Sequence, residues 1–251
     1  MTCVVADIGA SNARFAYIRK GRLSDIFMFP CDDFKTPVAM IESFVKGYAS
    51  EAQTVILGVA GVILKNRACW TNRSWILDIK KLKKKLGLKN LIVMNDVELQ
   101  GYALNRLSKK DLSFIQQHKL GPGPKILMSV GTGLGVCYLI NKQIYSAEYG
   151  QTLLESGLPI ETLISGHTLK CLQQEMKSVR SATQLFYNRL ASIAMNLALS
   201  LKATGGIYLY GGMLEEQAFR QFDFTKKFNH HPKMQAFLKT VRSEERRVGK
   251  E

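Results

Sequence analysis

Two short turns rich in small residues carry the first chemical signal in this chain. Each follows an apolar segment: Gly9–Asn12 lies in CVVADIGASNARFAYI, and Gly131–Gly135 lies in KILMSVGTGLGVCYLI. Such turns expose backbone N–H groups, and concave groups of amides bind phosphate oxygens. Ser11 and Thr132 add hydroxyl donors. The turns therefore predict two candidate phosphate sites, and Asp7, at the end of the first apolar segment, adds a carboxylate that a plain hairpin does not need.

The same glycines have a simpler explanation. Apolar and polar residues alternate on both sides of the first turn, which predicts an ordinary β-hairpin. Neither turn matches the GxxxxGK[ST] pattern of a P-loop. Taken alone, the turns are weak evidence for phosphate binding.

A third candidate group follows another apolar segment. Asn95 and Asp96 lie near the end of Asn90–Val97, and open α/β sheets place ligand-binding groups at strand ends. Asp96 also precedes a helical pattern, so capping that helix is the alternative role. The combination of two phosphate-type turns, the Asn-Asp pair, Glu148 and the Gly211–Gly212 pair favours a binding site.

The elements that must position these residues form two similar halves. In the first half, small-residue turns, apolar runs and a Thr-Pro helix start predict a mixed sheet with helices on its faces. The expected strands are the hairpin, 25–30, 54–63 and 90–97, and the expected helices follow Thr36 and span 79–87. The second half restarts with strand, turn and strand over 125–150, helices at 160–177 and 182–203, and a buried strand with a glycine turn at 205–213.

Two turns of related type, each opening one half, suggest a duplicated domain with a ligand cleft between the copies. The Gly- and Pro-rich segment LGPGPK, at 120–125, lies near the junction. We expect a smaller N-terminal lobe at 1–110 and a larger C-terminal lobe at 111–241.

Composition narrows the class of protein. The chain has 251 residues, of which 46% are hydrophobic, so it can bury one large core or two modest ones. Its five cysteines form no CxxC motif, and no leader or membrane-spanning segment stands out, so we expect a reduced, cytoplasmic protein. The net charge of +15 raises the alternative of nucleic-acid binding, but the lysines lie on solvated helical faces without an aromatic-lined basic groove. We expect neither a nucleic-acid nor a membrane partner.

Several motifs, in order along the chain, resemble those of the bacterial glucokinases, in the hexokinase and actin-like ATPase superfamily. ADIGASNARFA is similar to the family's D-x-G-G-T-N-A-R, TNRSW to its T-N-x-x-W, and VMNDV to its N-D-F motif. GTGLGV matches identically, AEYGQ resembles G-E-G-G-H, ETLISG resembles E-x-x-L-S-G, and GGIYLYGGM resembles the adenosine-side glycine motif. The resemblance implies two ribonuclease-H-like lobes and a homodimer that phosphorylates glucose, or a similar hexose, with ATP in the first step of glycolysis.

The resemblance also implies a role for each candidate residue. Asp96 is expected to be the general base that accepts the proton of the sugar 6-hydroxyl. The residues expected to bind the sugar are Asn95, Glu148, Gln151 and Glu161. The residues expected to bind ATP are Asp7, Gly9, Ala10, Ser11, Asn12, Gly131, Thr132, Gly133, Gly211 and Gly212. Asp7 is also expected to hold Mg²⁺ through water, because Mg²⁺ keeps much of its hydration shell.

Some positions depart from the family pattern. Ala10 replaces a glycine, and we expect it to resist any positive φ that the turn requires. Gln151 replaces the family's histidine, and Tyr149 replaces a glycine. Only 12 residues separate Glu148 from Glu161, which is fewer than the family usually has. These departures leave two alternatives open: a kinase of another hexose or amino sugar, and a catalytically silent relative that binds sugar or nucleotide.

The last ten residues have a different character. RSEERRVGKE, at 242–251, lacks an apolar period and resembles the translation of a sequencing adapter. We expect this segment to be an artefact, and the chain to lack the family's final strand and helix, which leaves apolar surface uncovered.

Overall fold

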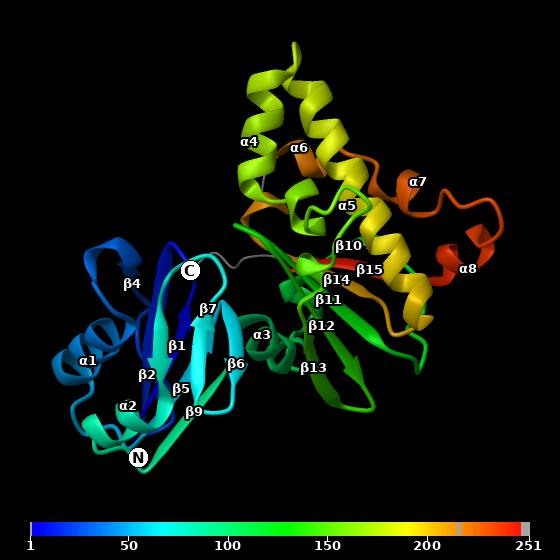
Figure 1. Ribbon diagram of the computed structural model, residues 1–251. Helices are drawn as coiled ribbons and strands as arrows, with labels where there is room; N and C mark the ends of the chain where they lie inside the picture. The colour runs from blue at the N-terminus through cyan, green and yellow to red at the C-terminus, as the bar shows by residue number, and fades with distance from the viewer. Residues whose placement is uncertain (1, 215–216, 247–251) are drawn as a thin grey trace. The chain divides into compact units, whose positions relative to one another are not determined.

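The computed structural model describes residues 2–214 and 217–246 (Figure 1). The chain divides into two compact units, Met1–Gln100 and Gly101–Glu251. Each unit has its own buried apolar cluster and its own mixed sheet flanked by helices. The expected α/β class is therefore confirmed. No helix in the described part of the chain is long and apolar enough to cross a membrane.

The first unit is built on a six-stranded sheet in the order β3-β2-β1-β5-β9, with β4 also paired to β2. Its strands are β1 (Thr2–Ile8), β2 (Asn12–Arg19), β3 (Arg22–Leu23), β4 (Phe27–Pro30), β5 (Thr54–Val59) and β9 (Asn90–Asn95). Strands β1 and β2 form the predicted antiparallel hairpin, and β5 and β9 run parallel to β1. The carboxyl ends of these three parallel strands therefore meet at one edge of the sheet.

The apolar run at 54–63 is not one strand, as its sequence suggests, but two. β5 ends at Val59, and β6 (Gly61–Leu64) belongs to a separate three-stranded sheet with β7 (Arg67–Trp70) and β8 (Ile76–Asp78). The chain changes sheets at Ala60, whose N–H donates to the carbonyl of Ile8 at 3.1 Å. Gly61 permits the break, because a Cβ there would lie 2.0 Å from the carbonyl oxygen of Cys69.

The helices of the first unit begin where their capping residues indicate. Thr36 accepts the N–H of Ala39 at 3.2 Å, and Pro37 starts α1 (Pro37–Tyr48). Asp78 caps the lysine-rich α2 (Ile79–Lys85) in the same way. Between β4 and α1 lies the short helical turn η1 (Cys31–Asp33). Since these ends rest on local side-chain bonds, the sequence predicts them well.

The second unit repeats the strand order of the first. Its sheet runs β10-β15-β14-β11-β12-β13, in which β11 and β12 form an antiparallel hairpin, and β14 and β15 run parallel to β11. The strands are β10 (Leu112–Gln116), β11 (Lys125–Val130), β12 (Leu134–Ile140), β13 (Gln143–Ala147), β14 (Ile207–Tyr210) and β15 (Ser243–Arg246). β11, β12, β14 and β15 thus correspond to β1, β2, β5 and β9.

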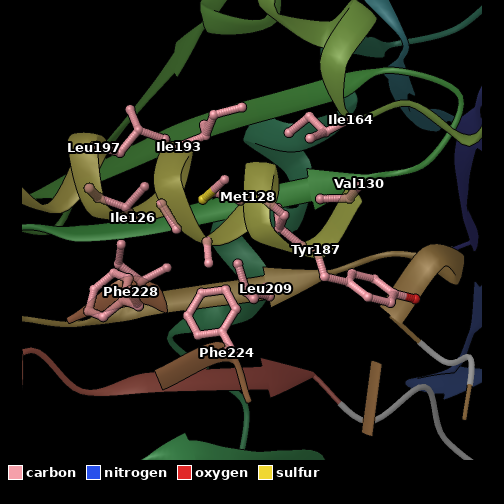
Figure 2. Packing of buried hydrophobic residues seen from close by; sticks show 14 of the residues in the cluster. Ile126, Met128, Val130, Ile164, Tyr187, Ile193, Leu197, Leu209, Phe224 and Phe228 are labelled. Carbon is pink, nitrogen blue, oxygen red and sulfur yellow. The ribbon is translucent and has the colours of Figure 1, made fainter. Parts of the chain in front are cut away.

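Helices cover the second sheet and enclose its core. They are α4 (Gly166–Glu175), α5 (Val179–Leu201), α6 (Gln217–Arg220), α7 (Phe224–Phe228) and α8 (Gln235–Thr240), with short helical turns η2 (Lys109–Asp111), η3 (Tyr149–Gln151), η4 (Ile160–Leu163) and η5 (Gly212–Leu214). The helix expected over 160–177 is two pieces, η4 and α4, because Ser165 begins α4 by accepting the N–H of Thr168. Figure 2 shows one continuous cluster in which β11 side chains such as Met128 pack with α5 and with Phe224 and Phe228 of α7.

The division between the units lies earlier than the expected boundary at residue 110. It follows Gln100, inside α3 (Asp96–Leu104). The physical reason is at Gly101, where a Cβ would lie 2.9 Å from both the Cys137 sulfur and an Ile144 methyl. The second half of α3 therefore packs on β12 and β13.

Part of the segment that the sequence indicates as an artefact is a strand in the structure. Ser243 and Glu244 of β15 are almost completely buried, and Glu244 pairs with the guanidinium of Arg242. Among the described residues, the Ser243 hydroxyl finds no hydrogen-bond partner. Burial and the neighbouring Glu244 raise the pKa of Tyr208 to about 12. Polar groups therefore occupy an inner strand that favours apolar side chains. The rest of the segment, 247–251, lies outside the described residues, and the origin of the segment stays a prediction.

We predict that replacing the buried pair with apolar residues stabilises the second unit. The double variant Arg242→Met, Glu244→Val should gain about 1–4 kcal/mol of unfolding free energy, because desolvation of a buried pair offsets its attraction. Glu244→Ala alone should lose about 3–5 kcal/mol, since it leaves a buried charge unpaired.

Calorimetric melting measures both effects. The exposed pair Arg19–Glu51 is the control, and its double variant Arg19→Gln, Glu51→Gln should change the melting temperature much less than either substitution of the buried pair. A less stable Arg242→Met, Glu244→Val variant would show that the buried pair is a net stabilising interaction.

Candidate functional site

The turn between β1 and β2, Gly9–Asn12, has its carbonyl groups bonded to the protein. The Ala10 carbonyl accepts from the Arg73 guanidinium at 2.9 Å, and the Ser11 carbonyl accepts the N–H of Cys31 at 2.8 Å. The Asn12 carbonyl accepts the Gly9 N–H at 3.0 Å. The Gly9 carbonyl accepts the Cys31 thiol at 3.6 Å. All four backbone carbonyls of the turn are therefore bonded, three of them to Arg73 and Cys31 and one within the turn.

The amide groups of the same turn are left available. Within residues 2–214 and 217–246, the N–H groups of Ala10 and Ser11 meet no acceptor. Because a trans peptide is planar, fixing the Ala10 carbonyl on one side directs the Ser11 N–H to the other. Neighbouring amides that face away from the protein fit the oxygen atoms of a phosphate group.

The substitution of glycine by Ala10 causes no backbone strain. Neither Ala10 nor Gly9 has a positive φ, so the concern raised by the sequence does not apply to this turn. Gly9 matters for space instead, because a Cβ there would lie 3.0 Å from the Asn12 carbonyl oxygen.

Asp7 lies at the end of β1, beside this turn. It pairs in register with Arg14 on β2 and with Gly58 on β5, and an Arg14 guanidinium nitrogen lies 3.9 Å from its carboxylate. Burial raises the pKa of Asp7, although Arg14 acts in the opposite direction. A partly desolvated carboxylate beside a phosphate-type turn suits a hydrated Mg²⁺ ion.

Asn95 and Asp96 lie at the same edge of the sheet. Ile8, Val59 and Asn95 are aligned across β1, β5 and β9, so two strand spacings separate the backbones of β1 and β9 there, or about 10 Å. The parallel strands thus bring Asp96 and the first turn to the same edge of the sheet, with the end of β5 between them.

The capping role that the sequence offers for Asp96 is mainly that of Asn95. The Asn95 side-chain oxygen accepts the N–H groups of Val97 and Glu98 at 2.9 and 3.3 Å, and its NH₂ donates to the Gly61 carbonyl. Asp96 is the first residue of α3, and its carboxylate accepts the Val97 N–H at 2.9 Å. The carboxylate is therefore fixed at a helix start.

Gly58 is a site residue that the sequence reasoning missed. A Cβ at Gly58 would lie 3.3 Å from Cα of Asp96 and 2.7 Å from a Leu99 methyl carbon. Because Gly58 has no side chain, α3 can begin in close contact with β5, and this contact determines how near Asp96 lies to the sheet. A glycine inside an otherwise apolar strand was the available signal.

The second turn, in the second unit, also bonds a carbonyl to the protein and leaves amides available, but with different partners. The Gly131 N–H donates to the Gly133 carbonyl at 3.0 Å, and the Gly131 carbonyl accepts the N–H of Gly166, the first residue of α4, at 2.8 Å. For the N–H groups of Thr132 and Gly133 no acceptor is found in the described part of the chain. This turn therefore also presents amides and withdraws a carbonyl.

The Gly211–Gly212 pair lies next to the second turn. Gly211 has φ of +126°, and a Cβ there would lie 2.2 Å from the Val130 carbonyl oxygen, so only glycine fits. Gly212 begins η5, and the carbonyl of the next residue, Met213, accepts the Tyr187 hydroxyl at 2.9 Å. The two glycine loops are thus adjacent at the ends of β11 and β14.

Three of the four residues expected to bind sugar, Glu148, Gln151 and Glu161, lie close together in the second unit. The Gln151 NH₂ donates to one Glu161 oxygen at 2.8 Å, and the other Glu161 oxygen accepts the Leu134 N–H at 3.3 Å. Burial, and secondly the charge of Glu161, raise the pKa of Glu148. Tyr149 packs against the apolar core. The short segment between the two glutamates is therefore long enough to bring Glu161 to Gln151.

The expected site residues thus form two sets, one in each unit. The first set contains Asp7, the Gly9–Asn12 turn, Asn95 and Asp96. The second set contains the Gly131–Gly135 turn and the Gly211–Gly212 pair, together with Glu148, Gln151 and Glu161. The described residues hold no group of three or more His, Cys, Asp or Glu side chains arranged to bind a metal ion. An ion held through Asp7 would need ligands from water and phosphate.

A family model described as Glucokinase matches residues 4–157 and 160–244. All of the expected site residues lie within these ranges. The glucokinase of Neisseria meningitidis serogroup C is 27% identical over 289 aligned residues, which cover 95% of this chain and 88% of that protein.

Solved structures show the same fold at lower identity. The glucokinase from Balamuthia mandrillaris in complex with glucose gives a TM-score of 0.82 at 18% identity, covering 98% of this chain and 89% of that one. A ROK family glucokinase from Streptomyces griseus in complex with glucose and AMPPNP gives a TM-score of 0.66 at 16% identity, covering 96% and 98%. These matches confirm the expected actin-like ATPase fold.

We predict that Asp7→Asn stabilises the protein at neutral pH. The pKa of Asp7 is raised in the folded state, so the wild type loses stability as pH rises from the usual Asp range through the folded pKa. The neutral amide avoids this loss, so the gain should be present at pH 7 and disappear at pH values below the usual Asp range. Thermal melts across pH measure it, with the exposed Asp25→Asn as the control. Equal melting temperatures at pH 7 would contradict the prediction.

We also predict that Glu161→Gln lowers the pKa of Glu148. The substitution removes the neighbouring negative charge, but burial, the larger cause, remains, so the pKa should stay above the usual glutamate range. Carboxyl ¹³C NMR titration measures the shift, and Glu155→Gln, an exposed change in the same segment, should leave it unaltered. An unchanged Glu148 pKa in Glu161→Gln would refute the interaction.

Proposed function

The chain belongs to the glucokinase family of sugar kinases, and we propose that it transfers the γ-phosphoryl group of ATP to the 6-hydroxyl of glucose. The observation that carries the proposal is the edge of the first sheet. There, a turn with available amides follows β1 and the Asn95–Asp96 pair lies at the end of β9, with one strand, β5, between them. A phosphate site beside a fixed carboxylate is what transfer to a hydroxyl group requires.

In this proposal, the sugar is bound through hydrogen bonds to its hydroxyl groups. Asn95, Glu148, Gln151 and Glu161 supply carboxylate and amide partners. Gln151 donates its NH₂ to Glu161, so its carbonyl oxygen is the atom that accepts from a sugar hydroxyl. Since a site built to pair hydroxyl groups rejects ligands that leave its own polar groups unpaired, these residues set the specificity.

The proposal assigns ATP binding to residues of the two glycine turns. Amides of Ala10, Ser11, Thr132 and Gly133 have no acceptor within the described residues, and they suit phosphate oxygens. Gly211 and Gly212 would border the nucleoside, and Asp7 would hold Mg²⁺ through water. When bound, Mg²⁺ neutralises phosphate charge.

Asp96 is the proposed general base. Its carboxylate is held by the Val97 N–H at 2.9 Å, which fixes it to accept the proton of the attacking 6-hydroxyl. In the proposal, the amides of the turns bind the phosphate groups and the polar residues bind the sugar. Positioning and charge neutralisation account for most of such catalysis.

We also propose that the chain is a soluble, cytoplasmic homodimer that acts in the first step of glycolysis. Light scattering on the purified chain and cell fractionation test the oligomeric state and the location separately from the assay.

We predict that Asp96→Asn lowers kcat by about 10²–10⁴-fold, because it removes the base. Glucose binding should remain, since the amide still accepts a hydrogen bond. A coupled ADP-release assay with glucose, mannose and glucosamine measures turnover, and calorimetric titration with glucose measures binding.

Asp25→Asn, the same charge change at an exposed site, should leave both measurements unaltered. A wild-type chain that binds glucose but turns over no hexose would favour the silent relative. Full turnover by Asp96→Asn would remove Asp96 from the role of base.

A further inference from the structure

Arg73 makes three hydrogen bonds, one to the first turn and two to η1, and no role discussed so far uses them. It lies between β7 and β8, and its guanidinium donates to the Ala10 carbonyl at 2.9 Å, the Cys31 carbonyl at 3.0 Å and the Asp32 carboxylate at 2.9 Å. Its side chain is only 21% exposed. One planar group thus joins the turn, η1 and the loop after β7.

These bonds act on the turn through peptide geometry. With its carbonyl held by Arg73, Ala10 can direct the Ser11 N–H only to the opposite side of the peptide plane. Cys31 supports the same arrangement, because its N–H holds the Ser11 carbonyl while its own carbonyl is held by Arg73. The guanidinium therefore lies behind the turn, and the available amides lie in front of it.

The position of Arg73 is itself fixed by the core. Its guanidinium carbon lies 4.3 Å from the ring centroid of Trp75, and Trp75 packs edge-on against Trp70 at 5.7 Å. The Trp70 ring N–H donates to the Ile8 carbonyl at 3.0 Å, one residue before the turn. A chain of contacts thus returns from the arginine to the strand that carries the turn.

We propose that Arg73 is a positioning residue that holds the Gly9–Asn12 turn in its phosphate-binding conformation. It acts through the turn and needs no contact with the nucleotide. The proposal rests on the proposed function, since it assigns the turn to ATP. Lysine cannot replace it, because only the guanidinium fork bonds two carbonyls and a carboxylate while stacking on an indole.

Steady-state kinetics on the full chain tests the consequence for nucleotide binding. In Arg73→Gln, the KM for ATP should rise by about tenfold or more, as expected for loss of charge-assisted bonds, while the KM for glucose stays within about twofold. Arg73→Lys should show a similar rise although it keeps the charge. Arg19→Gln is the matched control, because Arg19 also bonds a carboxylate and a carbonyl and stacks on a ring, but at the far end of β2. It should alter neither KM.

Hydrogen exchange gives a readout that does not depend on activity. Peptides covering the first turn should exchange faster in Arg73→Gln and Arg73→Lys than in wild type, because the turn loses its fixed carbonyl. Peptides covering the second turn should be unchanged in both variants, and peptides covering the first turn should be unchanged in Arg19→Gln. If the wild type phosphorylates no hexose, the proposed function fails. Hydrogen exchange of the turn peptides, together with titration of the wild type and the Arg73 variants with ADP, still decides the role of Arg73.

Three results would overturn the proposal. The first is an unchanged KM for ATP in both Arg73 variants. The second is an equal rise in both KM values with a lower melting temperature, which would mark a merely structural role. The third is unchanged exchange of the turn peptides. If Arg73→Gln does not fold, Arg73→Lys decides by the same readouts.

Discussion

The first unit depends on the rule that a peptide group cannot point its carbonyl and its N–H to the same side. To offer amides to a ligand, the Gly9–Asn12 turn must bury its carbonyls in bonds, and the protein supplies a partner for each. Cys31 comes from η1, Arg73 from the loop after β7, and the remaining bond closes within the turn. The three-stranded sheet β6-β7-β8 therefore does more than extend the fold, because it carries the support for the turn.

The second unit meets the same constraint with different parts. Its turn gives the Gly131 carbonyl to the first N–H of α4, and close approach of Gly211 to Val130 brings the glycine pair alongside. Where the first unit uses an arginine and a cysteine, the second uses a helix start and a residue without a side chain. The repeated strand order explains how both solutions occupy equivalent places in their sheets.

Local patterns predicted local structure, and contacts distant in sequence explain the rest. The β1–β2 hairpin, the Thr36 cap and the lysine-rich α2 depend on neighbouring residues, and they were predicted correctly. The break at Ala60 and the division inside α3 depend on Ile8 and Cys137, which lie far away in the sequence. The split before α4 follows from the local cap Ser165, which the helical pattern over 160–177 did not reveal. For the site, the motifs identified the turns and strand ends, but Gly58 and Arg73 act through contacts 38 and 63 residues away. The assigned roles remain predictions.

The absence of a positive φ at Ala10 has a consequence for how such proteins are found. A search pattern that demands two adjacent glycines after the aspartate treats the second as a conformational necessity, and it would pass over this chain. In this turn the requirement is room at the first position and a bonded carbonyl at the second, which alanine satisfies. A search that also scores the partner of that carbonyl, here an arginine two residues before a tryptophan, would recover sequences that a glycine count discards.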